Sequence, residues 1–450
     1  MRILFVCQFY APSVGGVQEV IRQIGERLAA RGHRVTVATS RWPTRKFAAL
    51  NGVRIEEFAV AGNAVAGLTG EVERYRSYVL RGEFDLIVIK AAQQWTFDAL
   101  WPVLDRIPAL KVFIPCGFSS LYEPAYTDYY RQMPAVLRQF DHLIFYASQY
   151  RDIDMALDHG LKNFSIIPNG ASEKEFDVAA DPSFRARHSI PERSLLFLTV
   201  GSFTGLKGHL EVAQAFSMLK LEAGEHATLI LNGNAVPLGM GTWSGILRNL
   251  RRSLRICGLR GTLRKLIEKA GGRAGIPLFA GETPLGIARR INQTCSDRRI
   301  LLTDYPRPDL IQAYMTADLF VFASHVEYSP LVLFESAAAG TPFLTVPVGN
   351  AEEIACWTGG GVVCPAGRDA KGYTRVDPSE LARFMSRLIH DEPLRKTLGA
   401  TGRRNWREKF TWDAISREYE GVFRLLLSPP GDGTSRHDPA EQMEGRTNGT

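Results

Sequence analysis

Residues 319–342 read LFVFASHVEYSPLVLFESAAAGTP, which is the pattern of a buried strand, a loop and a helix. The first four residues are apolar, and Pro330 suits the start of a helix because its missing N–H costs nothing there. Gly340 marks the end of that helix. Glu327 lies in the loop and Glu335 lies one turn into the helix, so two carboxylates flank a helix N-terminus that can bind an anion.

The alternation of apolar strands with helical periodicity continues on both sides of this stretch. One series of apolar segments is 3–7, 35–39, 86–89, 112–114, 143–145 and 165–167, and a second is 195–200, 229–231, 300–302, 319–322, 343–346 and 361–363. Such alternation predicts parallel sheets that are covered on both faces by helices. We therefore predict an α/β protein with two doubly wound, Rossmann-like domains facing each other across a ligand-binding cleft.

A turn at Pro168-Asn169-Gly170 separates the two series and marks the predicted domain boundary. The residues after Ser428 are rich in proline, glycine and polar side chains, which predicts a disordered tail. The predicted parts are an N-terminal domain at 1–168, a C-terminal domain at 169–409 with a basic insertion near 235–300, a helix at 410–427 and the tail at 428–450.

The composition is that of an ordinary soluble globular protein, with 450 residues, 45% hydrophobic and 22% charged. The six cysteines form no Cys-x-x-Cys pair, so we expect a reduced, cytoplasmic protein without a zinc site. No apolar run approaches the roughly 18 residues that a transmembrane helix needs. Any membrane contact is therefore expected to be peripheral.

Two glycine-containing loops follow apolar strands and are candidate phosphate sites. Gly15 and Gly16 lie between the first strand and the first helix, where glycine lets a phosphate approach the positive end of the helix. The loop that begins at Ser202 carries Lys207, whose ammonium can lie on a diphosphate. The alternatives are an ordinary turn that needs positive φ at the glycines and a solvated position for the lysine. The two glutamates have a similar alternative as solvated helix-end charges.

The order and spacing of these motifs resemble glycosyltransferase family 4, whose members are retaining, nucleotide-sugar-dependent enzymes of GT-B fold. The motifs are Gly-Gly-x-Gln after the first strand, Ile-Pro-Asn-Gly at the boundary, Gly-Ser with a following Lys-Gly, and Glu-x₇-Glu followed by Ala-x-Gly-Thr-Pro. The resemblance covers residues 1–420 apart from the stretch near 235–300. It implies that the N-terminal domain takes the acceptor, that the C-terminal domain takes the nucleotide sugar, and that the last helix crosses back to the first domain.

The resemblance also implies an activity. It predicts a metal-independent glycosyltransferase of the hexosyltransferase type (EC 2.4) that uses a UDP-sugar in preference to a GDP-sugar and needs no other cofactor. The acceptor would be a hydroxyl of a glycan or glycolipid, in the synthesis of cell-surface polysaccharide or glycoconjugate. Two further interpretations stay open, namely a non-catalytic GT-B scaffold that binds nucleotide sugar and a nucleotide-sugar epimerase.

Each motif receives a role through the resemblance. Gly16 would approach the donor phosphate and Lys207 would hold the diphosphate, while Glu327 would bind hydroxyls of the donor sugar and Glu335 the ribose. Lys207 and Glu327 are the catalytic candidates. The implied donor site comprises Gly15, Gly16, Ser202, Lys207, Tyr305, Glu327, Pro330, Leu331, Val332 and Glu335.

The chain departs from the family pattern at two positions. The family often has arginine where this chain has Ser202, so Lys207 is the evident cation and Arg307 is a possible substitute for the missing one. A histidine that often follows the fourth or fifth strand is replaced by Cys116 and Gly117, which we assign to the acceptor or sugar pocket. We expect Cys116 to be a buried structural cysteine rather than a nucleophile.

Asp152 and Asp154 match the Asp-x-Asp motif of metal-dependent glycosyltransferases of the other fold. They lie at the start of a predicted helix, where residues two apart point to different faces. Acids in a first helical turn need no further explanation. We therefore predict no metal site.

The excess of positive charge is concentrated between Arg248 and Arg273, where Glu268 is the single acid. Two cationic amphipathic helices in this segment would suit an anionic membrane surface at the inner face of the membrane. A solvated insertion packed on its domain is the alternative. The residues proposed to meet the membrane are Arg248, Arg251, Arg252 and Arg255. A nucleic-acid partner is not expected, because aromatic residues are few here and no known binding module is present.

Overall fold

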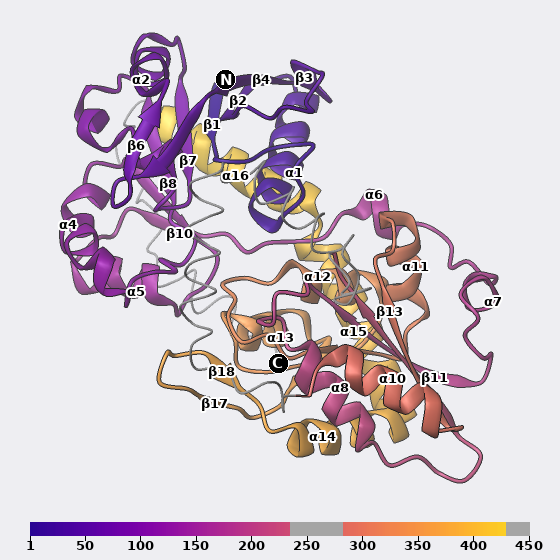
Figure 1. Cartoon of the computed structure of the whole chain (residues 1–450). Helices are drawn as coiled ribbons and strands as arrows, with labels where there is room; N and C mark the ends of the chain where they lie inside the picture. Colours follow the sequence, from indigo (N-terminus) through magenta and orange to yellow (C-terminus); the bar gives the residue numbers. More distant parts are fainter. Residues whose placement is uncertain (235–281, 429–450) are drawn as a thin grey trace. The chain divides into compact units, whose positions relative to one another are not determined.

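The computed structural model of the chain describes residues 1–234 and 282–428. It contains an eight-stranded sheet in the order β10-β9-β8-β7-β1-β2-β4-β3 and a six-stranded sheet in the order β13-β12-β11-β14-β15-β16 (Figure 1). In the larger sheet only the short β3 runs antiparallel, against β4. The predicted α/β architecture with two parallel sheets is confirmed.

The eight-stranded sheet is built from the N-terminal part of the chain. Its strands are β1 (Arg2–Val6), β2 (Arg34–Ser40), β3 (Ala49–Leu50), β4 (Val53–Phe58), β7 (Leu86–Lys90), β8 (Leu110–Ile114), β9 (His142–Phe145) and β10 (Phe164–Ile166). A separate hairpin is formed by β5 (Val60–Asn63) and β6 (Gly67–Gly70). The helices are α1 (Gly16–Ala30), α2 (Val72–Arg81), α3 (Trp95–Asp98), α4 (Thr127–Leu137), α5 (Arg151–Asp158) and α6 (Glu173–Phe176).

The apolar runs of this sheet are continuous because both of its faces are buried. In β1, Ile3 and Phe5 face one core together with residues of α1, whereas Leu4 and Val6 face the other. Each of these four side chains is fully buried. The parallel pairing of β1, β7, β8 and β9 places their carboxyl ends at one edge of the sheet.

The six-stranded sheet follows the same plan. Its strands are β11 (Ser194–Val200), β12 (His226–Asn232), β13 (Arg298–Thr303), β14 (Leu319–Phe322), β15 (Phe343–Thr345) and β16 (Gly361–Val363), and a small hairpin is formed by β17 (Gly367–Arg368) and β18 (Thr374–Arg375). The helices are α7 (Phe184–Arg187), α8 (His209–Ser217), α10 (Pro284–Thr294), α11 (Arg307–Thr316), α12 (Leu331–Ala339), α13 (Ala351–Thr358), α14 (Pro378–His390), α15 (Glu392–Asn405) and α16 (Trp412–Leu427).

The described chain divides into two compact units that are not continuous in sequence. The first holds Met1–Ala180, Val326–Pro365 and the described residues from Glu392 onward, and the second holds the described residues of Asp181–His325 together with Ala366–Asp391. The predicted domain ranges stay a prediction. Glu327, α12 and the loops of the eight-stranded sheet thus belong to the first unit, and the loop with Lys207 belongs to the second.

Helix α16 packs against α1 within the first unit, where the two run side by side in Figure 1. Its residues Ile415, Tyr419 and Phe423 are buried in the core beneath α1. Ion pairs join the two helical regions, from Arg31 to Asp413 at 2.6 Å. The last described helix therefore stabilises the sheet that carries the β1–α1 loop.

Two predictions fall partly or wholly outside the described residues. Of the basic insertion near 235–300, residues 235–281 lie outside them, and these include Arg248, Arg251, Arg252 and Arg255. The predicted disordered tail lies outside them from residue 429. In the parts that are described, no helix is both long and apolar enough to cross a bilayer.

Candidate active site

The segment between the two glutamates has the predicted geometry. Helix α12 starts at Leu331 after Pro330, which takes the capping position with φ −71° and ψ 114°. Gly340 ends the helix in the left-handed conformation, at φ 76°. The amides of Leu331 and Val332 lie in the first turn, where no intrahelical acceptor exists. Glu327 and Glu335 are both half-buried, on either side of this helix start.

A second helix N-terminus lies close to the first. Gly16 is the first residue of α1, and a Cβ added to it would lie 3.8 Å from Cδ1 of Leu331. Gly15 precedes the helix with an extended backbone, φ 172°, that any residue can adopt. The turn therefore does not need positive φ, and the alternative that explained the glycines this way is wrong. The structure thus brings together the starts of α1 and α12, two positive helix ends within one compact unit.

The predicted acceptor-side residues lie in a strained turn after β8. Cys116, Gly117 and Phe118 all have left-handed backbones, with φ of 61°, 83° and 47°. A Cβ on Gly117 would lie 2.8 Å from Cε1 of Tyr150 and 2.9 Å from Cγ of Tyr328, so only glycine fits. Non-glycine residues in this conformation store strain, which is typical of functional sites.

Cys116 is not set up as a nucleophile. The residue as a whole is half-buried, but burial of the thiol raises its pKa above the ordinary range and keeps it protonated. The nearby ammonium of Lys90, itself 1% exposed, opposes that shift only in part. Burial also lowers the pKa of Lys90, whose Nζ contacts the hydroxyl of Tyr146.

The loop with Lys207 belongs to the second compact unit, and close packing within that unit explains why glycine occurs at positions 201 and 208. Gly208 is left-handed at φ 71°, and a Cβ there would lie 2.0 Å from the carbonyl oxygen of Ala323. A Cβ on Gly201 would lie 2.9 Å from Cβ of Lys207. These close approaches fix the stem of Lys207 at the end of β11, where the residue is half-buried rather than freely solvated.

Further predicted residues of the second unit surround this strand end. The carbonyl oxygen of Ser202 accepts a hydrogen bond from the amide of Thr204 at 2.7 Å. The amide of Tyr305 donates to Oδ1 of Asn232 at 2.8 Å, which holds Tyr305 at the carboxyl end of β13. Arg307, the possible substitute cation, begins α11 and is half-buried.

His209, the first residue of α8, is not among the predicted site residues. Its ring stacks on Phe203 with centroids 4.3 Å apart, and burial lowers its pKa to about 4, so it is neutral near pH 7. Within the described ranges its buried Nε2 has no hydrogen-bond partner. The signal available in the sequence was a histidine directly after Lys207 and Gly208, which alone does not distinguish a site from a core position.

The two aspartates of the Asp-x-Asp motif point in different directions, as their spacing predicts. Asp152 is fully buried, whereas Asp154 is exposed on α5. Oδ2 of Asp152 accepts a hydrogen bond from the amide of Gly117 at 2.8 Å. The carboxylate thus has a role inside the protein, in holding the turn after β8. Across residues 1–234 and 282–428 no group of three or more His, Cys, Asp or Glu is placed to hold a metal ion.

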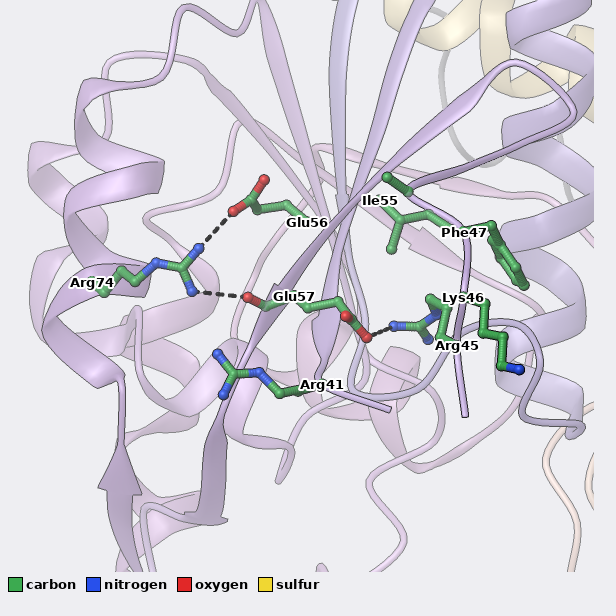
Figure 2. Close-up of a pocket in the computed structure, with 9 residues that line it drawn as sticks. Arg41, Arg45, Lys46, Phe47, Ile55, Glu56, Glu57 and Arg74 are labelled. Carbon is green, nitrogen blue, oxygen red and sulfur yellow. Dashed lines mark hydrogen bonds and ion pairs between the residues drawn. The ribbon is translucent and has the colours of Figure 1, made fainter. Parts of the chain in front are cut away.

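A charged groove of about 540 Å³ lies beside β4 in the first unit and contains none of the predicted site residues. Figure 2 shows Arg74 bonded to Glu56 and to the carbonyl of Glu57, and Arg45 bonded to the carboxylate of Glu57. Arg41 is paired with Glu71 at 3.1 Å. Because these arginines already have acidic partners, the groove carries compensated charge and is not assigned to the donor.

Comparisons with known proteins identify the family. Residues 14–174 match the model described as Glycosyltransferase Family 4, and residues 292–405 match the model described as Glycosyl transferases group 1. Over 437 residues the chain is 22% identical to N-acetyl-alpha-D-glucosaminyl L-malate synthase of Bacillus anthracis. The match covers 94% of this chain and 97% of that protein.

Solved structures with the same fold include sucrose-phosphate synthase from Thermosynechococcus elongatus, with a TM-score of 0.67, 20% identity and coverage of 95% of this chain and 99% of that one. Anabaena HepE in complex with UDP-glucose has a TM-score of 0.63 and 14% identity, with coverage of 94% and 100%. At these identities the likeness concerns the fold. Together with the two family models and the order of the motifs, it shows that this chain belongs to glycosyltransferase family 4 and has the GT-B fold.

Proposed function

We propose that the chain is a retaining glycosyltransferase that moves a sugar from a UDP-sugar, in preference to a GDP-sugar, to a hydroxyl of a glycan or glycolipid. The observation that carries this proposal is the approach of Gly16 to Leu331, which brings two helix N-termini together beside Glu327 and Glu335. Two sets of free amides suit the phosphates of a nucleotide, and the carboxylates suit sugar and ribose hydroxyls. HepE, a structure of the same fold, is named as a complex with UDP-glucose.

The chemical demand of the reaction is the departure of the diphosphate, whose oxygens gain charge as the bond to the sugar breaks. Fixed amides at the two helix starts can stabilise that charge without reorganisation, and Lys207 is the cation predicted to bind it. Glu327 holds the donor sugar, and the orientation of that sugar decides which of its faces the acceptor attacks. In this proposal the acceptor hydroxyl attacks the face of the sugar that the phosphate leaves, which gives retention, and the leaving phosphate takes the acceptor proton.

A screen of nucleotide sugars by thermal shift tests the donor. We expect UDP and UDP-sugars to raise the melting temperature more than GDP and GDP-sugars at equal concentration, since only a bound ligand stabilises the native state. A larger shift with GDP would overturn the preference for uridine. No shift with any nucleotide at millimolar concentration would overturn the donor site as a whole.

Turnover separates the transferase from the other two interpretations. With the preferred donor, release of UDP should depend on an added acceptor and persist in excess EDTA. L-malate is included beside oligosaccharides and lipid-linked sugars, because a relative is named for a malate product. Nucleotide binding without turnover would favour the scaffold, for which Ser202 and Cys116 are the supporting departures. Conversion of the donor sugar without an acceptor would favour the epimerase.

A further inference from the structure

Tyr328, the residue after Glu327, is inserted among side chains of the N-terminal sheet. Its ring stacks on Tyr146 with centroids 5.5 Å apart, lies 4.7 Å from the ring of Tyr150, and covers Gly117. Its hydroxyl accepts a hydrogen bond from the amide of Tyr146 at 3.0 Å. All of these residues belong to the first compact unit, so Tyr328 ties the segment with Glu327 to the loops after β8 and β9.

The hydroxyl of Tyr328 also interacts with the buried carboxylate of Asp152. Asp152 in turn accepts from the amides of Gly117 at 2.8 Å and of Ile153 at 3.0 Å. A buried carboxylate with these partners is well satisfied, and loss of one partner leaves a polar group inside the protein without compensation. Tyr328 and Asp152 therefore meet at Gly117, which the ring of Tyr328 covers and whose amide Asp152 binds.

The main chain around Glu327 is held by the same surroundings. The hydroxyl of Tyr150 donates to the carbonyl oxygen of Glu327 at 2.7 Å, and the amide of Asn350 donates to that of Tyr328 at 2.8 Å. A Cβ on Gly349 would lie 2.2 Å from the carbonyl oxygen of Tyr328. With contacts on both successive carbonyls and on the next side chain, the backbone at Glu327 has little freedom.

We propose that Tyr328 and Asp152 are positioning residues for the transfer reaction, and that their contacts with Gly117 fix the Glu327 segment and the Cys116–Phe118 turn as one rigid element. The inference rests on the proposed function, because it assigns to these two residues the alignment of Glu327 with the acceptor-side turn. Neither side chain touches the substrate. The turn is strained, so it needs a partner such as Asp152 to hold it in place.

The test compares Tyr328→Phe and Asp152→Asn with the control Tyr130→Phe. Tyr130 is 5% exposed, and its hydroxyl has no hydrogen-bond partner among the described residues, so the control removes a buried tyrosine hydroxyl without breaking a bond. Hydrogen exchange followed by mass spectrometry reports the amides of residues 116–119 in the absence of any substrate. Steady-state kinetics with the preferred UDP-sugar report kcat and the donor KM separately.

We expect Tyr328→Phe and Asp152→Asn each to speed exchange in the turn and to lower kcat about five- to tenfold, with the donor KM changed less than about twofold. The double variant should be no slower than the slower single variant, because both residues act on the same turn at Gly117. Tyr130→Phe should match the wild type in both measurements.

Faster exchange with an unchanged kcat would show a merely structural contact and would overturn the inference while leaving the transferase intact. Unchanged exchange would overturn it as well. If the wild type transfers no sugar from any nucleotide donor, the proposed function fails, and the positioning role fails with it. In that case the exchange measurement still reports whether Tyr328 and Asp152 hold the turn.

Discussion

The loops after β1 and β11 both carry glycines between a strand and a helix, but their glycines serve different purposes. Gly208 is left-handed and lies so close to Ala323 that a Cβ would come within 2.0 Å of its carbonyl oxygen. Gly16 begins α1 without a left-handed backbone, and among the described residues a Cβ there would meet only Leu331, at an ordinary 3.8 Å. The fold requires glycine at position 208 and does not require it at position 16.

Where the fold does not require a glycine, the space that a side chain would fill is available to a ligand. At Gly16 the free space lies at a helix N-terminus, so its occupant in our proposal is a donor phosphate. At Gly208 the space is already filled by the main chain of the neighbouring strand's loop. We therefore expect a substitution at Gly208 to lower stability and a substitution at Gly16 to lower the affinity for the ligand.

The largest effect is expected for Gly208→Ala. Both the backbone conformation and the contact with Ala323 oppose a side chain, so we expect a loss of more than about 4 kcal/mol in the free energy of unfolding, or no folded protein. Gly205→Ala is the matched control, because Gly205 has a φ of 83° and no atom of the described residues lies within 4 Å of the added Cβ. Its cost should be about 1–2 kcal/mol. Equal losses in urea denaturation would show that the close approach to Ala323 is unimportant.

The turn after β8 is a third case, since Cys116 and Phe118 are left-handed without being glycine. Burial raises the pKa of Asp152, which holds this turn, to about 6, and the neighbouring Tyr328 and Cys116 stay neutral because burial raises their pKa values too. The native state therefore binds more protons than the unfolded state between about pH 4 and 6. The contribution of Asp152 to the free energy of unfolding should fall by about 2–3 kcal/mol as the pH rises through this interval.

Urea denaturation of the wild type and of Asp152→Asn at pH 4, 5, 6 and 7 measures this effect. As the pH rises, the free energy of unfolding of the wild type should fall relative to that of Asp152→Asn, because asparagine has no charge to bury. A difference that is independent of pH would mean that Asp152 does not titrate in this range.

The ends of α12, the strand β14 and the fold class could be predicted from sequence, because they depend on local patterns. Pro330 and Gly340 mark the ends of α12 through backbone preferences that act within a few residues. The apolar segment Leu319–Phe322 predicted β14 for the same reason. The α/β class and the family followed from the order of such local signals along the chain.

The remaining features depend on contacts between residues far apart in sequence. Gly208 meets Ala323 only because β11 and β14 are neighbours in the sheet, and Tyr328 meets Asp152 and Gly117 only in the folded unit. Tyr328 gave no signal of its own, as an aromatic residue in a loop is common. Asp152 gave a misleading one, since its motif is that of a metal site and its actual partner is a backbone amide.

Lys207→Ala is expected to change catalysis more than stability. Loss of a charge-assisted contact to the leaving diphosphate amounts to about 1.5–3 kcal/mol, or roughly a 10- to 150-fold fall in kcat. The free energy of unfolding should change little, because the glycines on either side hold the loop through the backbone. Lys220→Ala, at an exposed position after α8, is the control and should leave both quantities unchanged. Wild-type turnover in the Lys207 variant would remove that residue from the mechanism.

The smallest effect, and the one that tests the comparison most directly, is expected for Gly16→Ala. Alanine favours the helix over glycine by up to about 1 kcal/mol, and the space at Leu331 accepts a methyl group, so stability should stay constant or rise. The affinity for UDP and UDP-glucose, measured by calorimetry, should fall about tenfold because the methyl group occupies the approach of the phosphate. Gly421→Ala in α16 is the matched control, because its added Cβ has no neighbour within 4 Å in the part of the chain that the structure describes. This variant should gain stability without losing nucleotide affinity. If Gly16→Ala binds nucleotide as tightly as the wild type, the space at Gly16 is not used by a ligand, and the two loops differ only in how the chain packs.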